Sequence, residues 1–293
     1  MENYSKHNKK RLCVFPVILL LFILMIALLL IDSNFRIVTT KYELYFSNLP
    51  ESFDGFRIVV LADIHDNEYG KDNERLLSRV RETNPDIIAI AGDILNAHNS
   101  ARSLAEQLKS AESLIISLTP IAPVYFVTGN HEMTFSDDEL ESLFLMLDIQ
   151  GVHLLRNEYT LLISGGDSIV LAGIDGKTGS VARKKAELFI EDMFASVDGA
   201  FVVVLNHYNQ YPEFFVEADI DLILSGHAHG GIIRLPFTDG LVGPNREWLP
   251  THTSGVYMLG NTTMLVSRGL GNATGMPRFL NNPHIAVAVL RSA

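Results

Sequence analysis

Five short apolar runs within residues 57–224 constrain the fold of this chain more than any other feature. Each run is rich in aliphatic residues, and small or polar residues follow it. Near-continuous apolar runs of this length are typical of strands buried on both faces. They occupy residues 57–62, 86–91, 124–127, 201–205 and 221–224. Helical patterns cover residues 73–83, 100–118, 136–147 and 180–196. The repetition of strand and helix predicts a layered α/β core.

Two hairpins are predicted in addition to these runs. Residues 159–163 and 168–171 flank a turn at 164–167, and residues 256–259 and 262–266 flank the tight pair Gly260-Asn261. A strand over residues 39–46 precedes the first run. The hairpins predict a second, β-rich layer, and we expect residues 285–290 to close that layer as its last strand. Because no linker rich in Pro, Gly or Ser interrupts the chain after residue 50, we interpret residues 56–293 as one domain.

Polar side chains with metal-binding chemistry follow all five runs. The carboxyl ends of strands in an open α/β sheet form one edge, where ligands bind, so we expect these residues to converge. Neighbours i and i+2 of an extended segment face the same side, which pairs Asp63 with His65 and His227 with His229. Carboxylates, imidazoles and an amide, without a thiolate, suit two hard or borderline divalent cations better than a structural zinc ion. The segments are Asp63-Ile64-His65, Gly92-Asp93, Gly129-Asn130-His131-Glu132, Asn206-His207 and Gly226-His227-Ala228-His229.

In this order, the five segments resemble the signature of the calcineurin-like metallophosphoesterases, and the resemblance covers residues 57–231. An N-terminal anchor together with residues 226–231, 234–236, 267–271 and 277–278 is also similar to the membrane-anchored bacterial branch, the YkuE/YaeI-like phosphoesterases. The resemblance implies a four-layer α/β/β/α sandwich. It also implies an enzyme that hydrolyses a phosphoester, phosphodiester or pyrophosphate bond through a hydroxide activated by two metal ions. Mixed oxygen and nitrogen ligands are compatible with manganese, iron or zinc.

The resemblance implies a role for each residue at the strand ends. Asp93 would bridge two divalent cations, which need an anion between them when they lie about 3.5–4 Å apart. His131 would stabilise charge in the transition state and protonate the leaving oxygen. The remaining ligands form one set for each ion: Asp63, His65 and His229, and Asn130, His207 and His227.

Three positions depart from the family pattern. An Asp that orients the catalytic histidine is usual where Asn96 stands, so we expect Glu132 or Asp66 to orient His131 instead. Ile232 replaces a usual Gln, and His284 replaces a usual Glu. These two changes affect the expected substrate pocket and leave the metal ligands intact.

Arg268 and Arg278 are the candidates for substrate contact. An acidic domain that binds an anion needs local guanidinium groups, which can bind phosphate through paired hydrogen bonds. Structural salt bridges are the alternative role for both arginines. His98 and Tyr211 are weaker candidates, for which an exposed loop position and an ordinary packed ring are the alternatives.

An uncharged segment at residues 12–31 predicts a transmembrane helix. As a helix it would span about 30 Å, which is the thickness of the hydrocarbon core of a bilayer. We interpret it as a retained signal anchor, with a cleaved signal peptide as the alternative. Four basic residues within positions 1–11 place that end in the cytoplasm. Residues 32–55, a connecting segment with a first strand, and the domain at 56–293 would then lie outside, on a single-pass protein of the cell membrane.

Charge and anchoring limit the partners of this chain. Its formal net charge is -11, which disfavours binding to a nucleic-acid backbone. The anchor predicts contact with a membrane and a phosphate-containing substrate in or beside it, such as a phospholipid or a lipid-linked nucleotide sugar. The alternatives are a soluble phosphodiester or phosphoprotein substrate, and a surface protein that binds metal without turnover. The complete set of ligand positions counts against the last of these.

Overall fold

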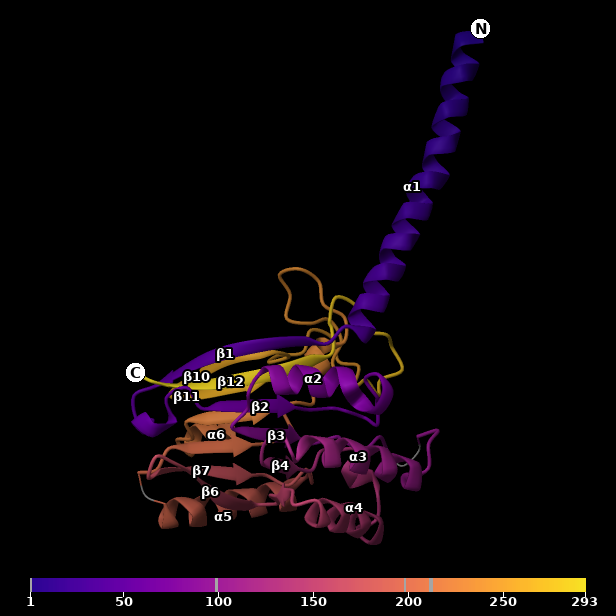
Figure 1. The fold of residues 1–293 in the computed structure, drawn as a ribbon. Helices are drawn as coiled ribbons and strands as arrows, with labels where there is room; N and C mark the ends of the chain where they lie inside the picture. The colour runs from indigo at the N-terminus through magenta and orange to yellow at the C-terminus, as the bar shows by residue number, and fades with distance from the viewer. Residues whose placement is uncertain (1, 98–99, 198, 211–212) are drawn as a thin grey trace.

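Two six-stranded sheets packed face to face form the body of the protein in a computed structural model (Figure 1). The structure describes residues 2–97, 100–197, 199–210 and 213–293. Buried apolar side chains form three clusters: one between the first sheet and its helices, one between the sheets, and one between the second sheet and its helices. Three apolar interfaces require four layers, so the predicted α/β/β/α sandwich is confirmed.

The first sheet has the strand order β1-β12-β2-β3-β4-β5. Strands β2 to β5 are parallel, and β12 is antiparallel to β2 and parallel to β1. Every residue of β3 is buried, because this strand lies in the middle of the sheet with a layer on each face. The bounds are β1 (Val38–Phe46), β2 (Arg57–Leu61), β3 (Ile87–Ala91), β4 (Val124–Val127), β5 (His153–Leu154) and β12 (His284–Ser292).

The second sheet has the order β10-β11-β9-β8-β7-β6. Both predicted hairpins form, and they supply its two edges. Ser164 pairs with Asp167, which leaves Gly165 and Gly166 as a two-residue turn, and both glycines have positive φ (56° and 98°) as this turn requires. The bounds are β6 (Glu158–Ser164), β7 (Asp167–Gly173), β8 (Val202–Leu205), β9 (Leu222–Ser225), β10 (Gly255–Leu259) and β11 (Thr262–Val266).

Helices cover the outer face of each sheet. The first sheet packs against α2 (Glu74–Glu82), α3 (Leu104–Leu118) and α4 (Asp137–Ile149), and the second against α5 (Ser180–Ser196) and α6 (Glu213–Glu217). Capping boxes begin α3 and α4, in which Ser103 pairs with Glu106 and Ser136 with Glu139.

The five apolar runs are divided between the two sheets, with β2, β3 and β4 in the first and β8 and β9 in the second. One expectation about the sheets is wrong, because the last strand, β12, does not close the hairpin layer but lies between β1 and β2. Its alternate residues face two different cores, with Ala286 in the cluster between the sheets and Val287 in the cluster under the helices. A strand that is apolar on both faces fits the interior of either sheet, so its pattern does not reveal which one it joins.

Helix α1 (Glu2–Phe35) projects away from the sandwich (Figure 1). Its segment Val14–Phe35 is long and apolar enough to cross a membrane, and its most apolar stretch is not buried by the rest of the protein. The chain between this helix and residue 56 is not a loose connection, because β1 pairs along its whole length with β12. Residues 38–46 therefore belong to the first sheet, although the predicted boundary at residue 56 leaves them outside the domain.

Candidate metal centre

The polar residues that follow the strands converge at one end of the sandwich. Their carboxylate and imidazole groups form three groups whose ligand atoms all lie within 4.8 Å of one another. The groups are Asp63, His65 and His229; His65, Asp93 and His131; and Asp93, His207 and His227. Two of the groups share Asp93, so this carboxylate lies where a bridging ligand would be needed.

Distances between ligand atoms fit divalent cations. The Nε2 atoms of His65 and His229 are 3.2 Å apart, and His207 Nε2 lies 3.1 Å from His227 Nδ1 and 2.9 Å from Asn130 Oδ1. Zinc–nitrogen bonds of about 2.0–2.1 Å place neighbouring ligand atoms roughly 3.0–3.4 Å apart around one ion. The oxygen and nitrogen donors are also the types that manganese, iron and zinc accept. These residues therefore fit two metal ions.

The carboxylate of Asp93 lies between the two sets. Its Oδ2 is 3.8 Å from His65 Nε2 and 3.3 Å from His207 Nε2. The Asp93 side chain is held in this place from a third direction, because its Oδ1 accepts the backbone N–H of His131 at 2.8 Å.

Left-handed backbone conformations orient the candidate ligands, and they change the predicted pairing of His227 with His229. Asp63, His65, Asp93, His227 and His229 have φ values of 52°, 48°, 54°, 65° and 48°. The segment around His227 and His229 is thus a turn, so neighbours i and i+2 do not face one side. His227 joins Asp93, whereas His229 joins Asp63. The expected pairing of His227 with His229 is wrong, and the observed split follows the two ligand sets that the family resemblance implies.

Burial and the attraction between Asp93 and His207 set the charge of the site. Burial lowers the pKa of His65 and of His227 to about 3, so their imidazoles are neutral near pH 7, as metal ligation requires. Burial also opposes charge on Asp93 and His207, but their mutual attraction prevails. It holds the pKa of Asp93 well below its usual range and raises the pKa of His207 to about 9. A cation bound beside His207 would replace this proton.

Residues 56–231, more than half of the chain, match the Calcineurin-like phosphoesterase family. The chain belongs to this family. It is 29% identical over 267 residues to "Uncharacterized metallophosphoesterase YkuE" of Bacillus subtilis (strain 168), covering 87% of this chain and 86% of that protein. It is 29% identical over 263 residues to "Transmembrane protein with metallophosphoesterase domain" of Danio rerio, covering 86% of this chain and 56% of that protein. It is 22% identical over 223 residues to "Phosphodiesterase YaeI" of Escherichia coli (strain K12), covering 75% and 77%.

Membership confirms the resemblance and makes the chain a phosphoester hydrolase of a family that uses divalent metal ions. Helix α1 and the transmembrane relatives point to a membrane protein.

His131 lies at the edge of the metal centre of this metallophosphoesterase. Its ring packs edge-on against that of His65, with the centroids 4.4 Å apart. Its buried Nδ1 has no hydrogen-bond partner within the described chain. The expectation that Glu132 or Asp66 orients this ring is wrong, because the Asp66 carboxylate pairs with Arg102 at 2.6 Å and Glu132 is engaged elsewhere.

Glu132 joins two of the segments that carry ligands. Its carboxylate accepts the backbone N–H groups of Asp93, Leu95 and Gly129 at 2.8, 2.9 and 2.7 Å. The side chain is fully buried, and burial raises its pKa to about 7. In the sequence, only its position directly after His131 marked Glu132 as a candidate for the site. The folded chain shows that it fixes the loops after β3 and β4.

The two candidate arginines differ in placement. Arg278 is buried, and its guanidinium donates to the backbone carbonyls of Arg268, His229 and Gly271 at 2.9, 3.3 and 2.6 Å. This placement favours a role in holding the loop of His229. The half-buried Arg268 guanidinium has no hydrogen bond or ion pair within the part of the chain that the structure describes. His98 and Tyr211 lie outside the described residues.

The loop of Arg278 also holds the end of α1, a contact that sequence analysis missed. The backbone N–H of Arg278 donates to Asn34 Oδ1 at 3.0 Å, and Asn34 Nδ2 donates to the Arg278 carbonyl at 2.9 Å. Leu280 N–H donates to Ser33 Oγ at 2.8 Å. Helix α1 is therefore fixed to a loop that contacts the segment of the candidate ligand His229.

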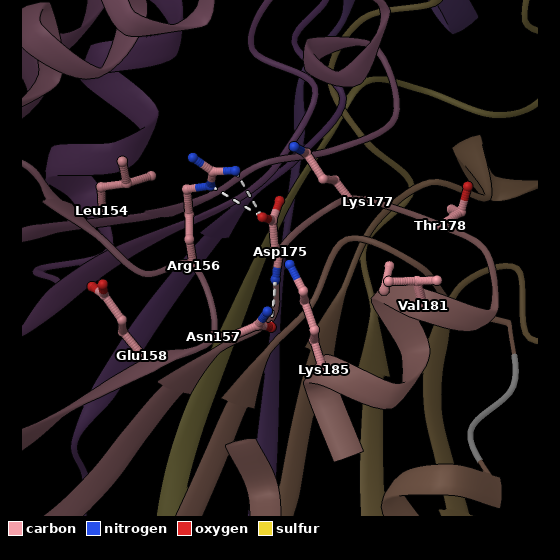
Figure 2. Close-up of a pocket in the computed structure, with 10 residues that line it drawn as sticks. Leu154, Arg156, Asn157, Glu158, Asp175, Lys177, Thr178, Val181 and Lys185 are labelled. Carbon is pink, nitrogen blue, oxygen red and sulfur yellow. Dashed lines mark hydrogen bonds and ion pairs between the residues drawn. The ribbon is translucent and has the colours of Figure 1, made fainter. Parts of the chain in front are cut away.

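A cavity of about 590 Å³ lies between β5, β6 and α5 and contains none of the candidate ligands (Figure 2). Its wall includes an ion pair between Arg156 and Asp175 at 2.8 Å, and Figure 2 shows Lys177 and Lys185 on either side of that aspartate. Asp175 Oδ1 accepts the Thr128 hydroxyl at 2.8 Å, two residues before the candidate ligand Asn130. This cavity is thus a neighbour of the metal centre and separate from it.

Proposed function

We propose that this enzyme hydrolyses a phosphoester, phosphodiester or pyrophosphate bond in a membrane-associated substrate, such as a phospholipid or a lipid-linked nucleotide sugar. The observation that carries the proposal is the direct attachment of α1 to the loop beside the metal ligands. A catalytic end fixed to a membrane helix meets substrates of the same membrane at high effective concentration. The relative named Phosphodiesterase YaeI supports the phosphodiester among the three bond types.

Each residue has a proposed role at the metal centre. Divalent cations supply Lewis acidity toward phosphoryl oxygens and toward water. Asp93 would lie between the two cations and offset their charge. His131 donates a proton to the leaving oxygen and stabilises charge, and the Arg268 guanidinium binds a phosphoryl oxygen or a charged head group. The proposed ligands are Asp63, His65 and His229 for one ion, and Asn130, His207 and His227 for the other.

We also propose that α1 crosses the cell membrane once and leaves the sandwich on the extracytoplasmic side. The basic residues within positions 1–11 and the apolar segment Val14–Phe35 support this orientation.

Hydrolysis by the full-length enzyme in liposomes tests the proposal. A chromogenic phosphodiester is compared with lipid-linked pyrophosphates and phospholipids, with and without Mn²⁺, Fe²⁺ or Zn²⁺. We expect metal-dependent turnover that is fastest on a lipid substrate. Turnover of soluble esters alone would replace the membrane substrate with a soluble one. Tight metal binding with no turnover of any substrate would favour a binding protein.

A further inference from the structure

The loop between β9 and β10 exposes several large apolar side chains. We call residues 235–249 the apolar loop. Phe237 is fully exposed, and Trp248 and Leu249 are 77% and 67% exposed. Grouped apolar side chains of this size on a protein surface mark sites of contact with a protein, a ligand or a membrane. No described residue covers them, so the contact partner lies outside this chain's own fold.

The apolar loop has a defined conformation. Its backbone forms two tight turns, closed by the hydrogen bonds Thr238 N to Leu235 O at 3.1 Å and Arg246 N to Gly243 O at 2.9 Å. Phe237 and Leu249 have φ values of 68° and 54°, a region that bulky side chains rarely adopt and that costs free energy. Glycine or asparagine would relieve this strain. Stability of the fold therefore does not explain why bulky apolar residues stand at these exposed, strained positions.

Hydrogen bonds fix the apolar loop relative to α1. Arg234 N–H donates to the Phe279 carbonyl at 3.0 Å, and Phe279 N–H donates to the Ile232 carbonyl at 3.2 Å. The next residue, Leu280, donates to Ser33 at the end of α1. Figure 1 shows this loop, in orange, rising beside the base of α1 on the same side of the sandwich.

We infer that the apolar loop inserts into the interface of the membrane that α1 spans and forms a second contact with the bilayer. This inference rests on the proposal that α1 is a membrane anchor. The base of the helix also exposes apolar side chains, with Ile31 and Phe35 57% and 59% exposed. Tryptophan favours the boundary between hydrocarbon and head groups, and interfacial apolar segments bury themselves about 5–10 Å deep. The partner of the loop is thus the lipid itself.

A second contact orients the metal centre. A helix alone allows the domain to rotate about the membrane normal and to tilt, whereas two contacts restrict the tilt. The loop leads directly from the metal-ligand segment, and Arg234 Nη1 donates to the Gly230 carbonyl, one residue after His229, at 3.0 Å. Insertion would therefore hold the ligands at a fixed height above the lipid head groups.

Trp248 allows a direct test because it is the only tryptophan of the chain. The full-length protein is reconstituted in phosphatidylcholine vesicles that contain lipids brominated at defined depths, and its tryptophan emission is recorded. We expect emission at shorter wavelength than that of an indole in water. We also expect strong quenching by lipids brominated near the head group, and weaker quenching by lipids brominated near the chain ends.

A double variant and a matched control separate insertion from simple proximity. Phe237→Ser combined with Leu249→Ser keeps Trp248 and should remove most of the quenching, while flotation with the vesicles persists through α1. Ile163→Ser changes an equally exposed apolar residue, 75% exposed, on the edge strand β6 of the second sheet, and should leave the quenching unchanged.

Three outcomes would overturn the inference. A water-like, unquenched Trp248 on protein that floats with vesicles would refute insertion and leave α1 as an anchor. Failure to float would refute the membrane proposal and this inference with it. If the emission shifts without quenching by the lipids, and the shift grows with the ratio of protein to lipid, the loop contacts a second copy of the chain instead of the bilayer.

Discussion

Asp93 is restrained by contacts with four neighbouring groups. Its side chain is close to His65 and His207 and accepts the His131 N–H, while its own backbone N–H donates to Glu132. A Cβ on Gly129 would lie 2.2 Å from Asp93 Oδ1, so only glycine allows the two segments to approach this closely. The glycine of the Gly-Asn-His-Glu segment is therefore explained by packing against the Asp93 carboxylate.

Asp93→Asn should remove at least one metal ion and nearly all activity. The substitution preserves shape but removes the negative charge that would separate two cations. Metal content by elemental analysis and turnover of a chromogenic diester measure the effect. The exposed Asp167→Asn variant is the control and should resemble the parent protein. Two tightly bound ions in Asp93→Asn would contradict the bridging role.

His131→Ala should keep both metal ions and lose roughly 10²–10⁴-fold in rate, the usual contribution of general acid catalysis. Esters with very acidic leaving groups need no protonation, so their hydrolysis should suffer less. Rates for a series of leaving groups, with His153→Ala as an exposed histidine control, measure the difference. Equal losses across the series would exclude His131 as the acid.

At the level of elements, α1 and the loop at residues 278–282 act as one unit. The side-chain amide of Asn34 forms two hydrogen bonds with the backbone of Arg278, one to its carbonyl and one from its N–H. Arg278 and Asn281 in turn donate to the carbonyl of His229. The end of α1 thus supports a candidate metal ligand through a single intervening loop.

Asn34→Ala should lower stability and weaken metal binding together. Each lost hydrogen bond costs about 0.5–1.5 kcal/mol net, so the pair contributes about 1–3 kcal/mol. We expect a lower midpoint of thermal unfolding in detergent and a weaker affinity for the ion near His229. Asn48→Ala removes an exposed hydrogen bond to Asp221 and serves as the control. Lower stability with unchanged metal affinity would show that the contact is structural only.

For the molecule as a whole, the candidate metal centre and the apolar helix α1 lie at the same end. The carboxyl ends of β2, β3, β4, β8 and β9 carry the candidate ligands, and the loops at that end also contact α1. A short, rigid attachment gives little advantage for a freely diffusing substrate, but it concentrates the enzyme on substrates of its own membrane.

Truncation at two points separates anchoring from support of the site. A chain that begins at Asp32 keeps the contacts of Ser33 and Asn34 with residues 278–282, so it should retain hydrolysis of a soluble diester and lose most turnover of lipid substrates in vesicles. A chain that begins at Arg36 lacks those contacts and should also lose metal affinity. Equal rates of the Asp32 chain and the full-length enzyme on every lipid substrate would exclude a membrane substrate.

Local patterns determined much of this protein from the sequence alone. An apolar run marks a buried strand because burial on both faces leaves no polar position, and all five runs form strands. The candidate ligands at the five strand ends were recognisable because the packing of the fold does not require carboxylates and imidazoles at each of these positions. The apolar segment at residues 12–31 was visible because its length matches a bilayer. The roles of the individual site residues stay predictions until the variants are measured.

Only the tertiary structure decided how these parts are combined. The assignment of β12 to the first sheet, the separation of His227 from His229 and the burial of Arg278 depend on contacts between distant segments. Asn34 and Arg278 are 244 positions apart, and no periodic pattern links them. Strand periodicity reports which faces are buried, but it carries no information on which neighbour buries them. The candidate site and its attachment to α1 therefore became visible only in the packed structure.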